Sequence, residues 1–96
     1  MKYFFEPRSV AVVGASRDPK KDGYIILKNI VDSFSGQIFP VNPNSDEICG
    51  LKAYRSLLDI PNEVDLTVII VPAKIVPSVM EDCAKKGVKR VIIESM

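Results

Sequence analysis

The stretch that decides the fold reads Val10-Ala11-Val12-Val13-Gly14-Ala15-Ser16-Arg17-Asp18-Pro19-Lys20-Lys21-Asp22-Gly23. Four apolar residues end at Gly14, a polar and basic loop follows, and a segment with helical apolar spacing begins near Tyr24. A strand that passes through a glycine turn into a helix places an anionic ligand at the helix N-terminus. The dinucleotide fingerprint G-x-G-x-x-G is absent, because Ser16 and Pro19 stand where further glycines would be. The loop therefore predicts a phosphate site that differs from the usual nicotinamide site.

The rest of the chain alternates apolar strands with amphipathic helices, which is typical of a parallel α/β sheet. The longest apolar run, residues 64–71, predicts a central buried strand. We expect an open parallel sheet of about five strands with helices on both faces. The expected strands are residues 9–13, 37–41, 51–54, 64–71 and 88–93, and the expected helices are 23–34 and 77–86, with one helical turn at 56–59.

Residues 1–96 have the length of one small domain. The sequence stops just after the last expected strand, and an open sheet normally covers the face beside such a strand with a further helix. We therefore expect residues 1–96 to be the N-terminal part of a larger protein, with the last part of the domain truncated. An uncovered last strand also predicts self-association through its edge.

Composition excludes several classes of protein. The net charge of +1 argues against a dedicated nucleic-acid binder. The sequence contains no run of 18 apolar residues, so we expect no membrane-spanning helix. Cys49 and Cys83 lack metal-ligand spacing and indicate reduced thiols in a cytoplasmic protein. The chain contains no histidine, which excludes a Ser–His or Cys–His catalytic pair and a histidine zinc site. We expect neither catalytic nor metal-binding residues within the chain.

An open parallel sheet binds ligands beyond the carboxyl ends of its strands. Four segments meet that condition here: residues 14–23, 42–45, 72–75 and 94–96. In the first, Arg17 can pair bidentately with a phosphate, Lys20 and Lys21 can act as point charges, and Ser16 can donate a hydroxyl hydrogen bond. The alternative is an ordinary solvated turn.

The other segments carry weaker signals. Asn42 stands where a dinucleotide-binding fold places an acidic residue against the ribose; its amide can still bond a ribose or a 3′-phosphate without repelling the phosphate. Pro72 and Ala73 leave room for a flat ring or a chain against the backbone. The alternatives are a plain turn at Asn42 and simple termination of the strand at Pro72.

Five motifs, in this order and at this spacing, resemble the CoA-binding domain of NDP-forming acyl-CoA synthetases, a family similar to the alpha subunit of succinyl-CoA synthetase. The resemblance covers nearly the whole chain. The motifs are Glu6-Pro7-Arg8-Ser9-Val10-Ala11-Val12-Val13-Gly14-Ala15-Ser16, Phe39-Pro40-Val41-Asn42-Pro43, Gly50-Leu51-Lys52-Ala53-Tyr54, Ser56-Leu57-Leu58-Asp59-Ile60-Pro61 and Val64-Asp65-Leu66-Thr67-Val68-Ile69-Ile70-Val71-Pro72-Ala73.

The resemblance implies a Rossmann-like α/β domain that holds coenzyme A. In the family, the loop after the first strand binds the adenosine and phosphate portion of coenzyme A, which corresponds here to Ser16, Arg17, Asp18 and Pro19. Together with Gly14, Lys20 and Gly23, these residues form the expected loop site. The remaining coenzyme A contacts that we expect are Asn42, Pro43 and Ser45 after the second strand, Val71, Pro72 and Ala73 after the central strand, and Glu94, Ser95 and Met96 after the last strand.

The resemblance also implies a parent enzyme, an ADP-forming acid–thiol ligase that works through a phosphohistidine in a later domain. The isolated chain is expected to be inactive because it has no histidine. Its expected partners are coenzyme A and the remaining domains or ATP-grasp subunit of the synthetase. Two alternatives stay open: a stand-alone or regulatory CoA-binding module, and an NAD(P)-binding redox domain. Against the redox domain, Asp18-Pro19-Lys20 replaces the glycines of the cofactor turn, and no Tyr-x-x-x-Lys motif occurs.

Overall fold

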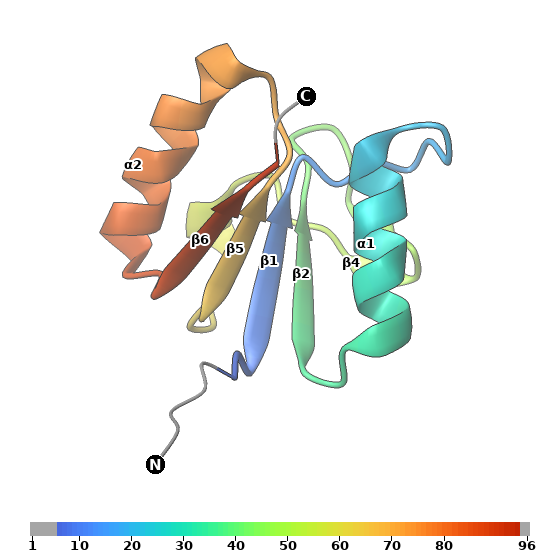
Figure 1. Ribbon diagram of the computed structural model, residues 1–96, viewed down its shortest axis with the longest axis horizontal. Coiled ribbons are helices and arrows are strands. Elements are labelled where there is room, and N and C mark those ends of the chain that lie inside the picture. The colour runs from blue at the N-terminus through green and yellow to red at the C-terminus, as the bar shows by residue number, and fades with distance from the viewer. Residues whose placement is uncertain (1–5, 95–96) are drawn as a thin grey trace.

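The computed structural model describes residues 6–94, and these form an α/β fold around a sheet of four parallel strands (Figure 1). The strands are β1 (Ser9–Val13), β2 (Gln37–Val41), β5 (Leu66–Ile69) and β6 (Arg90–Ile93), in the spatial order β2-β1-β5-β6. Val13, Val41, Ile69 and Ile93 lie opposite one another in the ladder. The carboxyl ends of all four strands therefore meet at one edge, as expected for a parallel sheet.

Of the expected edge strand at residues 51–54, residues 51–52 are a strand but pair outside the main sheet, which has four strands in the described residues where about five were expected. Instead, β3 (Glu47–Ile48) and β4 (Leu51–Lys52) form a separate antiparallel hairpin. The turn between them has Cys49 at φ 53° and Gly50 at φ 75°. Positive φ at both turn residues is the geometry of a tight hairpin, so the chain reverses at once and β4 pairs with β3. One isolated bridge, from Tyr54 to Val41, joins this segment to the main sheet.

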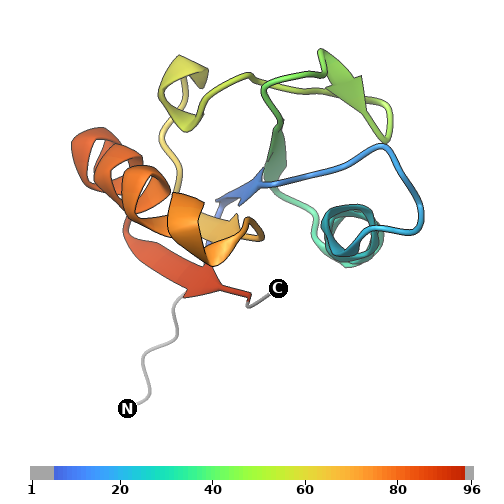
Figure 2. The same ribbon diagram turned by 90° about the horizontal axis from the view of Figure 1, so that it is seen from above.

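The two α-helices cover opposite faces of the sheet, as the sequence predicts (Figure 2). Helix α1 (Asp22–Ser33) packs Leu27 against Val10 and Val12 on one face. Helix α2 (Val76–Lys86) packs Val79 and Cys83 on the other face. Alternate residues of β1 point to opposite faces, which is why a continuous apolar strand serves both helices. The short turn η2 (Ala73–Ile75) leads from β5 into α2.

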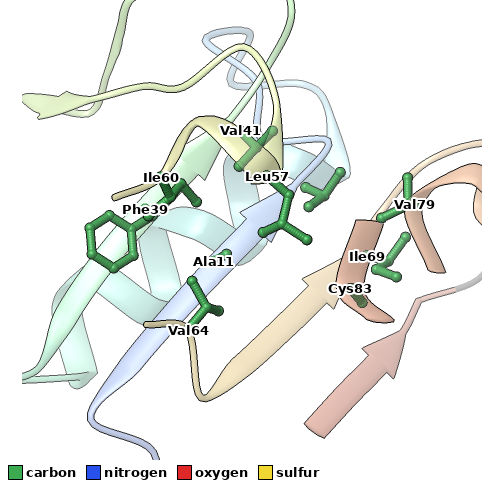
Figure 3. Close-up of a cluster of buried hydrophobic side chains, with 10 residues drawn as sticks. Ala11, Phe39, Val41, Leu57, Ile60, Val64, Ile69, Val79 and Cys83 are labelled. Carbon is green, nitrogen blue, oxygen red and sulfur yellow. The ribbon is translucent and has the colours of Figure 1, made fainter. Parts of the chain in front are cut away.

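A second short helical turn, η1 (Leu57–Asp59), completes the core on the α2 face. Leu57 and Ile60 are each 2% exposed, in one cluster with Ala11 and Phe39. Figure 3 shows Ile60 beside Phe39 and Leu57 above Ala11. Burial of a side chain of this size contributes roughly 1.5–3 kcal/mol, so η1 fixes the segment that follows the hairpin firmly against the sheet.

The bounds of the later elements differ slightly from those expected. Strand β5 is shorter than residues 64–71, although Ile70 continues the ladder through its N–H, which donates to Val13 O at 2.8 Å. Gly87 ends α2 in the left-handed conformation, φ 78°, and the N–H of Val88 donates to Cys83 O. Because residues 87–88 form this C-cap, they are not part of the following strand, and β6 begins at Arg90.

Strand β6 lies at the edge of the sheet. Ile92 is 46% exposed and Ile93 is 50% exposed. Within residues 6–94, no strand pairs with the outer edge of β6. The apolar last strand is therefore only partly covered, as the sequence predicts.

Candidate functional site

Three loops come together beyond the carboxyl ends of β1, β2 and β5 (Figure 1). The N–H of Gly14 donates to Val41 O at 3.1 Å, and that of Ile70 donates to Val13 O at 2.8 Å. The expected segments 14–23, 42–45 and 72–75 thus begin side by side. Glu94 follows β6 at the same edge, where its N–H donates to Ile69 O. Ser95 and Met96 lie outside the described residues.

Two glycines let these backbones approach closely. Gly14 has φ 98°, and a Cβ there would lie 2.0 Å from Ile70 O. A Cβ on Gly23 would lie 2.0 Å from Gly14 O. In the dinucleotide fingerprint, the first glycine makes the turn and the third allows close helix–strand packing. Gly14 and Gly23 fill these two roles here at a longer spacing than the glycines of a G-x-G-x-x-G motif.

The loop between these glycines orders itself and exposes its cations. Ser16 Oγ accepts a hydrogen bond from the N–H of Asp18, and Asp18 Oδ1 accepts one from the N–H of Lys20, both at 3.0 Å. Arg17, Lys20 and Lys21 are exposed. Lys21 is the N-cap of α1 and makes no side-chain cap. The loop therefore presents positive charge beside a helix N-terminus, an arrangement that favours an anion.

Asn42 connects two of the loops. Its Nδ2 donates to Ala15 O at 2.8 Å, and its Oδ1 accepts from the N–H of Asn44 at 2.7 Å. Both ends of the amide thus already have partners within the chain. Asn42 acts first as a brace between the β1 loop and the β2 turn. Ser45 is buried in this turn, and its N–H lies 3.4 Å from Asn42 O.

An apolar cavity of about 260 Å³ opens at the same edge, on the α2 face. Ligand pockets usually measure about 300–1,000 Å³, so this cavity suits one ring-sized part of a larger ligand. Gly14, Pro43 and Val71 from the expected site line it. Its full lining is Val13, Gly14, Val41, Pro43, Arg55, Ser56, Leu57, Val71, Ile75, Val79 and Asp82.

Sequence reasoning missed the cavity residues that come from residues 55–57 and from α2, whereas Ile75 of η2 belongs to the expected segment 72–75. The missed segments carry no phosphate motif, and they reach the cavity because they cover the α2 face of the sheet. The only signal in the sequence that could have located Arg55 and Ser56 is that they directly follow Tyr54 in the expected strand 51–54. In the structure the N–H of Tyr54 donates to Pro40 O in β2 at 2.9 Å, which brings both residues to the end of β2. Pro72 and Ala73 are exposed at the start of η2 and do not line the cavity.

A second hollow, of about 640 Å³, lies at the amino-terminal ends of the strands. Several of its polar groups pair with one another. Asp65 accepts a hydrogen bond from the N–H of Arg8 at 2.7 Å, and Lys89 Nζ lies 3.6 Å from its other oxygen. The Arg8 hydrogen bond, followed by the Lys89 charge, lowers the pKa of the Asp65 carboxyl. This hollow is far from the strand ends that bind ligands in such sheets, so we place the candidate site at the carboxyl edge.

No group of three or more His, Cys, Asp or Glu side chains within residues 6–94 is arranged to hold a metal ion. Neither helix in that range has the length and apolar character needed to cross a bilayer.

The comparisons with known proteins agree on one kind of domain. A model described as "CoA binding domain" matches residues 8–95. The chain is 52% identical to an ADP-forming acetate–CoA ligase of Methanocaldococcus jannaschii, over 97% of this chain and 13% of the relative. It is 48% identical to the dinucleotide-forming acetyl-coenzyme A synthetase 1 of Ca. Korarchaeum cryptofilum, solved with phosphate and ADP, with a TM-score of 0.87 over 91% of this chain and 19% of that one.

Shorter relatives occur as well. A conserved hypothetical protein of Pyrococcus furiosus is 42% identical, with a TM-score of 0.83, over 91% of this chain and 74% of that chain. The chain thus spans about a fifth or less of the two ligases and most of the shorter protein.

Proposed function

This chain belongs to the family of CoA-binding domains, and from that premise we propose that it binds coenzyme A across the carboxyl edge of its sheet. The observation that carries the proposal is the juxtaposition of an exposed basic loop with an apolar cavity, joined at Gly14. Coenzyme A has the matching parts, namely a diphosphate beside an adenosine. A ligand that was entirely apolar or entirely charged would use only half of this site.

The diphosphate is assigned to the loop that follows β1. Arg17, Lys20 and Lys21 supply positive charge there, and the N-terminus of α1 adds a favourable dipole. Asp18 carries a negative charge in the same loop, but its carboxylate accepts the N–H of Lys20 and orders the turn. Ser16, Asp18 and Pro19 therefore shape the loop while the three cations meet the phosphates.

The adenine ring is assigned to the apolar cavity. A dinucleotide-binding fold meets the ribose of its ligand near the end of the second strand. Here Val41 and Pro43, at the end of β2, line the cavity together with Val71, which follows β5. The thiol arm of coenzyme A then runs out along Pro72 and Ala73 towards Glu94.

We further propose that the parent protein is an ADP-forming acyl-CoA ligase, in which this domain presents coenzyme A to the remaining domains or to an ATP-grasp subunit. Support comes from the two ligases of which the chain matches a small part. The chain supplies no histidine, so the phosphoryl-transfer step belongs to those other parts. Its role in the reaction is to bind and orient the thiol substrate.

A stand-alone CoA-binding module is the second candidate. The observation in its favour is the Pyrococcus furiosus protein of which the matched region makes up 74%. Both candidates share the same ligand, so a binding experiment tests them together and separates them from an NAD(P)-binding redox domain.

The test is a calorimetric titration of the purified chain with coenzyme A and with NAD. We expect coenzyme A to bind more tightly, because the loop is basic and no carboxylate stands at Asn42 to hold a free ribose. Equal or tighter binding of NAD would overturn the proposal and favour the redox domain. Absence of heat with both ligands, confirmed by unchanged thermal midpoints, would overturn coenzyme A binding by this chain.

A further inference from the structure

Arg55 is held beside the end of β2 by its neighbour in the sequence. The N–H of Tyr54 donates to Pro40 O, and the carbonyl oxygen of Tyr54 accepts from the N–H of Asn42, both at 2.9 Å. The backbone on either side of the β2 end is therefore fixed to the segment that carries Arg55. Among the described residues that line the apolar cavity, Arg55 is the only cation.

The end of the second strand is where this architecture meets the adenosine ribose. An acidic residue there selects a free 2′-hydroxyl, whereas a nearby arginine accommodates a phosphate on the ribose. This chain has Asn42 in place of the acid, and the amide of Asn42 is engaged with Ala15 and Asn44. A ribose phosphate is thus not repelled by the β2 end, and the nearest cation on the cavity wall is a guanidinium, which matches phosphate bidentately.

The present partners of Arg55 are weak and leave it available. Its Nη1 lies 3.4 Å from Pro43 O, and its Nη2 lies 3.2 Å from Asp46 Oδ1. The side chains of Arg55 and Asp46 are 64% and 83% exposed, and ion pairs this exposed contribute little. Asp46 thus holds the guanidinium near the β2 turn and competes only weakly with a phosphate. Asp82, the other ionisable residue of the cavity, is negative, so a phosphate is favoured on the Arg55 side.

We propose that Arg55 binds the ribose 3′-phosphate of coenzyme A and is the residue by which this site distinguishes coenzyme A from ligands that lack this phosphate. The inference rests on the proposed function and assigns the phosphates of coenzyme A to two separate basic groups. Arg17 and its neighbours meet the diphosphate beside α1, and Arg55 meets the 3′-phosphate beside β2. Nothing in the Tyr54-Arg55-Ser56 sequence marks this role, which depends on the position of the residue at the cavity rim.

The experiment titrates coenzyme A and 3′-dephospho-coenzyme A into the wild-type chain and into Arg55→Gln. We expect the wild type to bind coenzyme A about 10- to 100-fold more tightly than the dephospho form, the scale of a charge-assisted hydrogen-bonded pair. Arg55→Gln should reduce coenzyme A affinity to that of the dephospho form and leave the dephospho form unchanged. Arg55→Lys should keep only part of the preference, because a lysine cannot pair bidentately.

Two further variants control for charge and folding. Lys28→Gln removes the same charge from the exposed face of α1, where Lys28 pairs with Asp32, and should leave both affinities unchanged. Asp46→Asn removes the weakly competing carboxylate and should raise coenzyme A affinity only slightly, without affecting the dephospho form. Thermal midpoints of all variants should match that of the wild type, because these side chains are exposed.

The outcomes separate the inference from the proposed function. If the wild type binds coenzyme A and dephospho-coenzyme A equally, coenzyme A binding stands and the role of Arg55 is overturned. The role of Arg55 is also overturned if Arg55→Gln weakens both ligands equally or neither. If the wild type binds neither ligand, the proposed function itself fails.

Discussion

The contact between Gly23 and Gly14 predicts that Gly23→Ala destabilises the domain, although glycine-to-alanine changes in helices normally stabilise. Gly23 lies in the first turn of α1 and does not have a positive φ. At such a position alanine is favoured over glycine by up to about 1 kcal/mol. The packing opposes this gain, because the added Cβ would lie 2.0 Å from Gly14 O, a backbone atom that cannot rotate away.

The size of the effect follows from the distance. Ordinary contact for a Cβ begins at 3.4 Å, so the N-terminus of α1 must move more than 1 Å away from β1 or the backbone must strain. Overpacking of this kind costs about 1–3 kcal/mol, occasionally more. A 2.0 Å approach to a backbone atom belongs in the upper part of this range, so that a net loss of up to about 2 kcal/mol remains after the helical gain is subtracted. Each kcal/mol lowers the Tm of a domain of this size by about 4–8 °C.

The assay is urea unfolding followed by circular dichroism, with Gly50→Ala as the control. An added Cβ at Gly50 meets no atom within 4 Å, so its cost comes from the positive φ alone. Both variants should lose stability, but only Gly23→Ala should also weaken coenzyme A binding, because it displaces the helix N-terminus from the loop. A Gly23→Ala chain as stable as the wild type, with unchanged affinity, would refute the packing argument.

The remaining predictions concern the loop, an ion pair, the sheet edge and catalysis. Arg17→Ala should cost about 1.5–3 kcal/mol of coenzyme A affinity in calorimetry, the scale of a hydrogen bond to a charged group; an unchanged affinity would show that Arg17 is a solvated side chain. The Asp65 pKa is lowered in the folded state, so its stabilisation is present above the pKa of the unfolded chain and lost as the pH falls. Asp65→Asn should therefore flatten the acid side of the stability profile, whereas a parallel profile would contradict the assignment. The exposed edge of β6 should allow self-association in light scattering, and Ile92→Lys should abolish it; a monodisperse wild-type monomer would show that the edge is adequately covered. Incubation of the isolated chain with ATP, coenzyme A and short carboxylic acids should release no ADP above background, because the chain has no histidine to relay a phosphoryl group.

Periodicity in the sequence was enough to locate the sheet and both α-helices, because each has a long apolar pattern that only one element type can bury. The same periodicity could not predict the β3–β4 hairpin. Residues 51–54 have the alternation of a strand, but their pairing depends on the turn at Cys49 and Gly50, and a cysteine is not a recognised residue for positive φ. The pattern predicts extended backbone correctly and gives no information about which strand is the partner.

The candidate site, too, was predictable from the sequence only in part. Its loops were predictable, because the carboxyl ends of parallel strands must meet at one edge. Arg55 and Asp82 were not, since Arg55 is placed by the hydrogen bonds of Tyr54 to the end of β2 and Asp82 by the packing of α2 on the sheet. The sequence suggests Asn42 as a ligand group, whereas the structure gives its amide two partners within the chain. Its contact with coenzyme A, like those of the other loop residues, stays a prediction.

The order of the strands has a consequence for how the chain folds. Strand β1 comes first in the sequence but lies in the interior of the sheet, where Val10 pairs with Ile38 on one side and with Leu66 on the other. The second pairing spans 56 residues and the first 28, and doubling a loop adds only about 0.6 kcal/mol of closure entropy. The thermodynamic difference is small, but synthesis is directional: β1, α1 and β2 leave the ribosome well before β5. During that interval the inner edge of β1 is unpaired, and the nascent chain is exposed to mispairing until residue 69 has emerged.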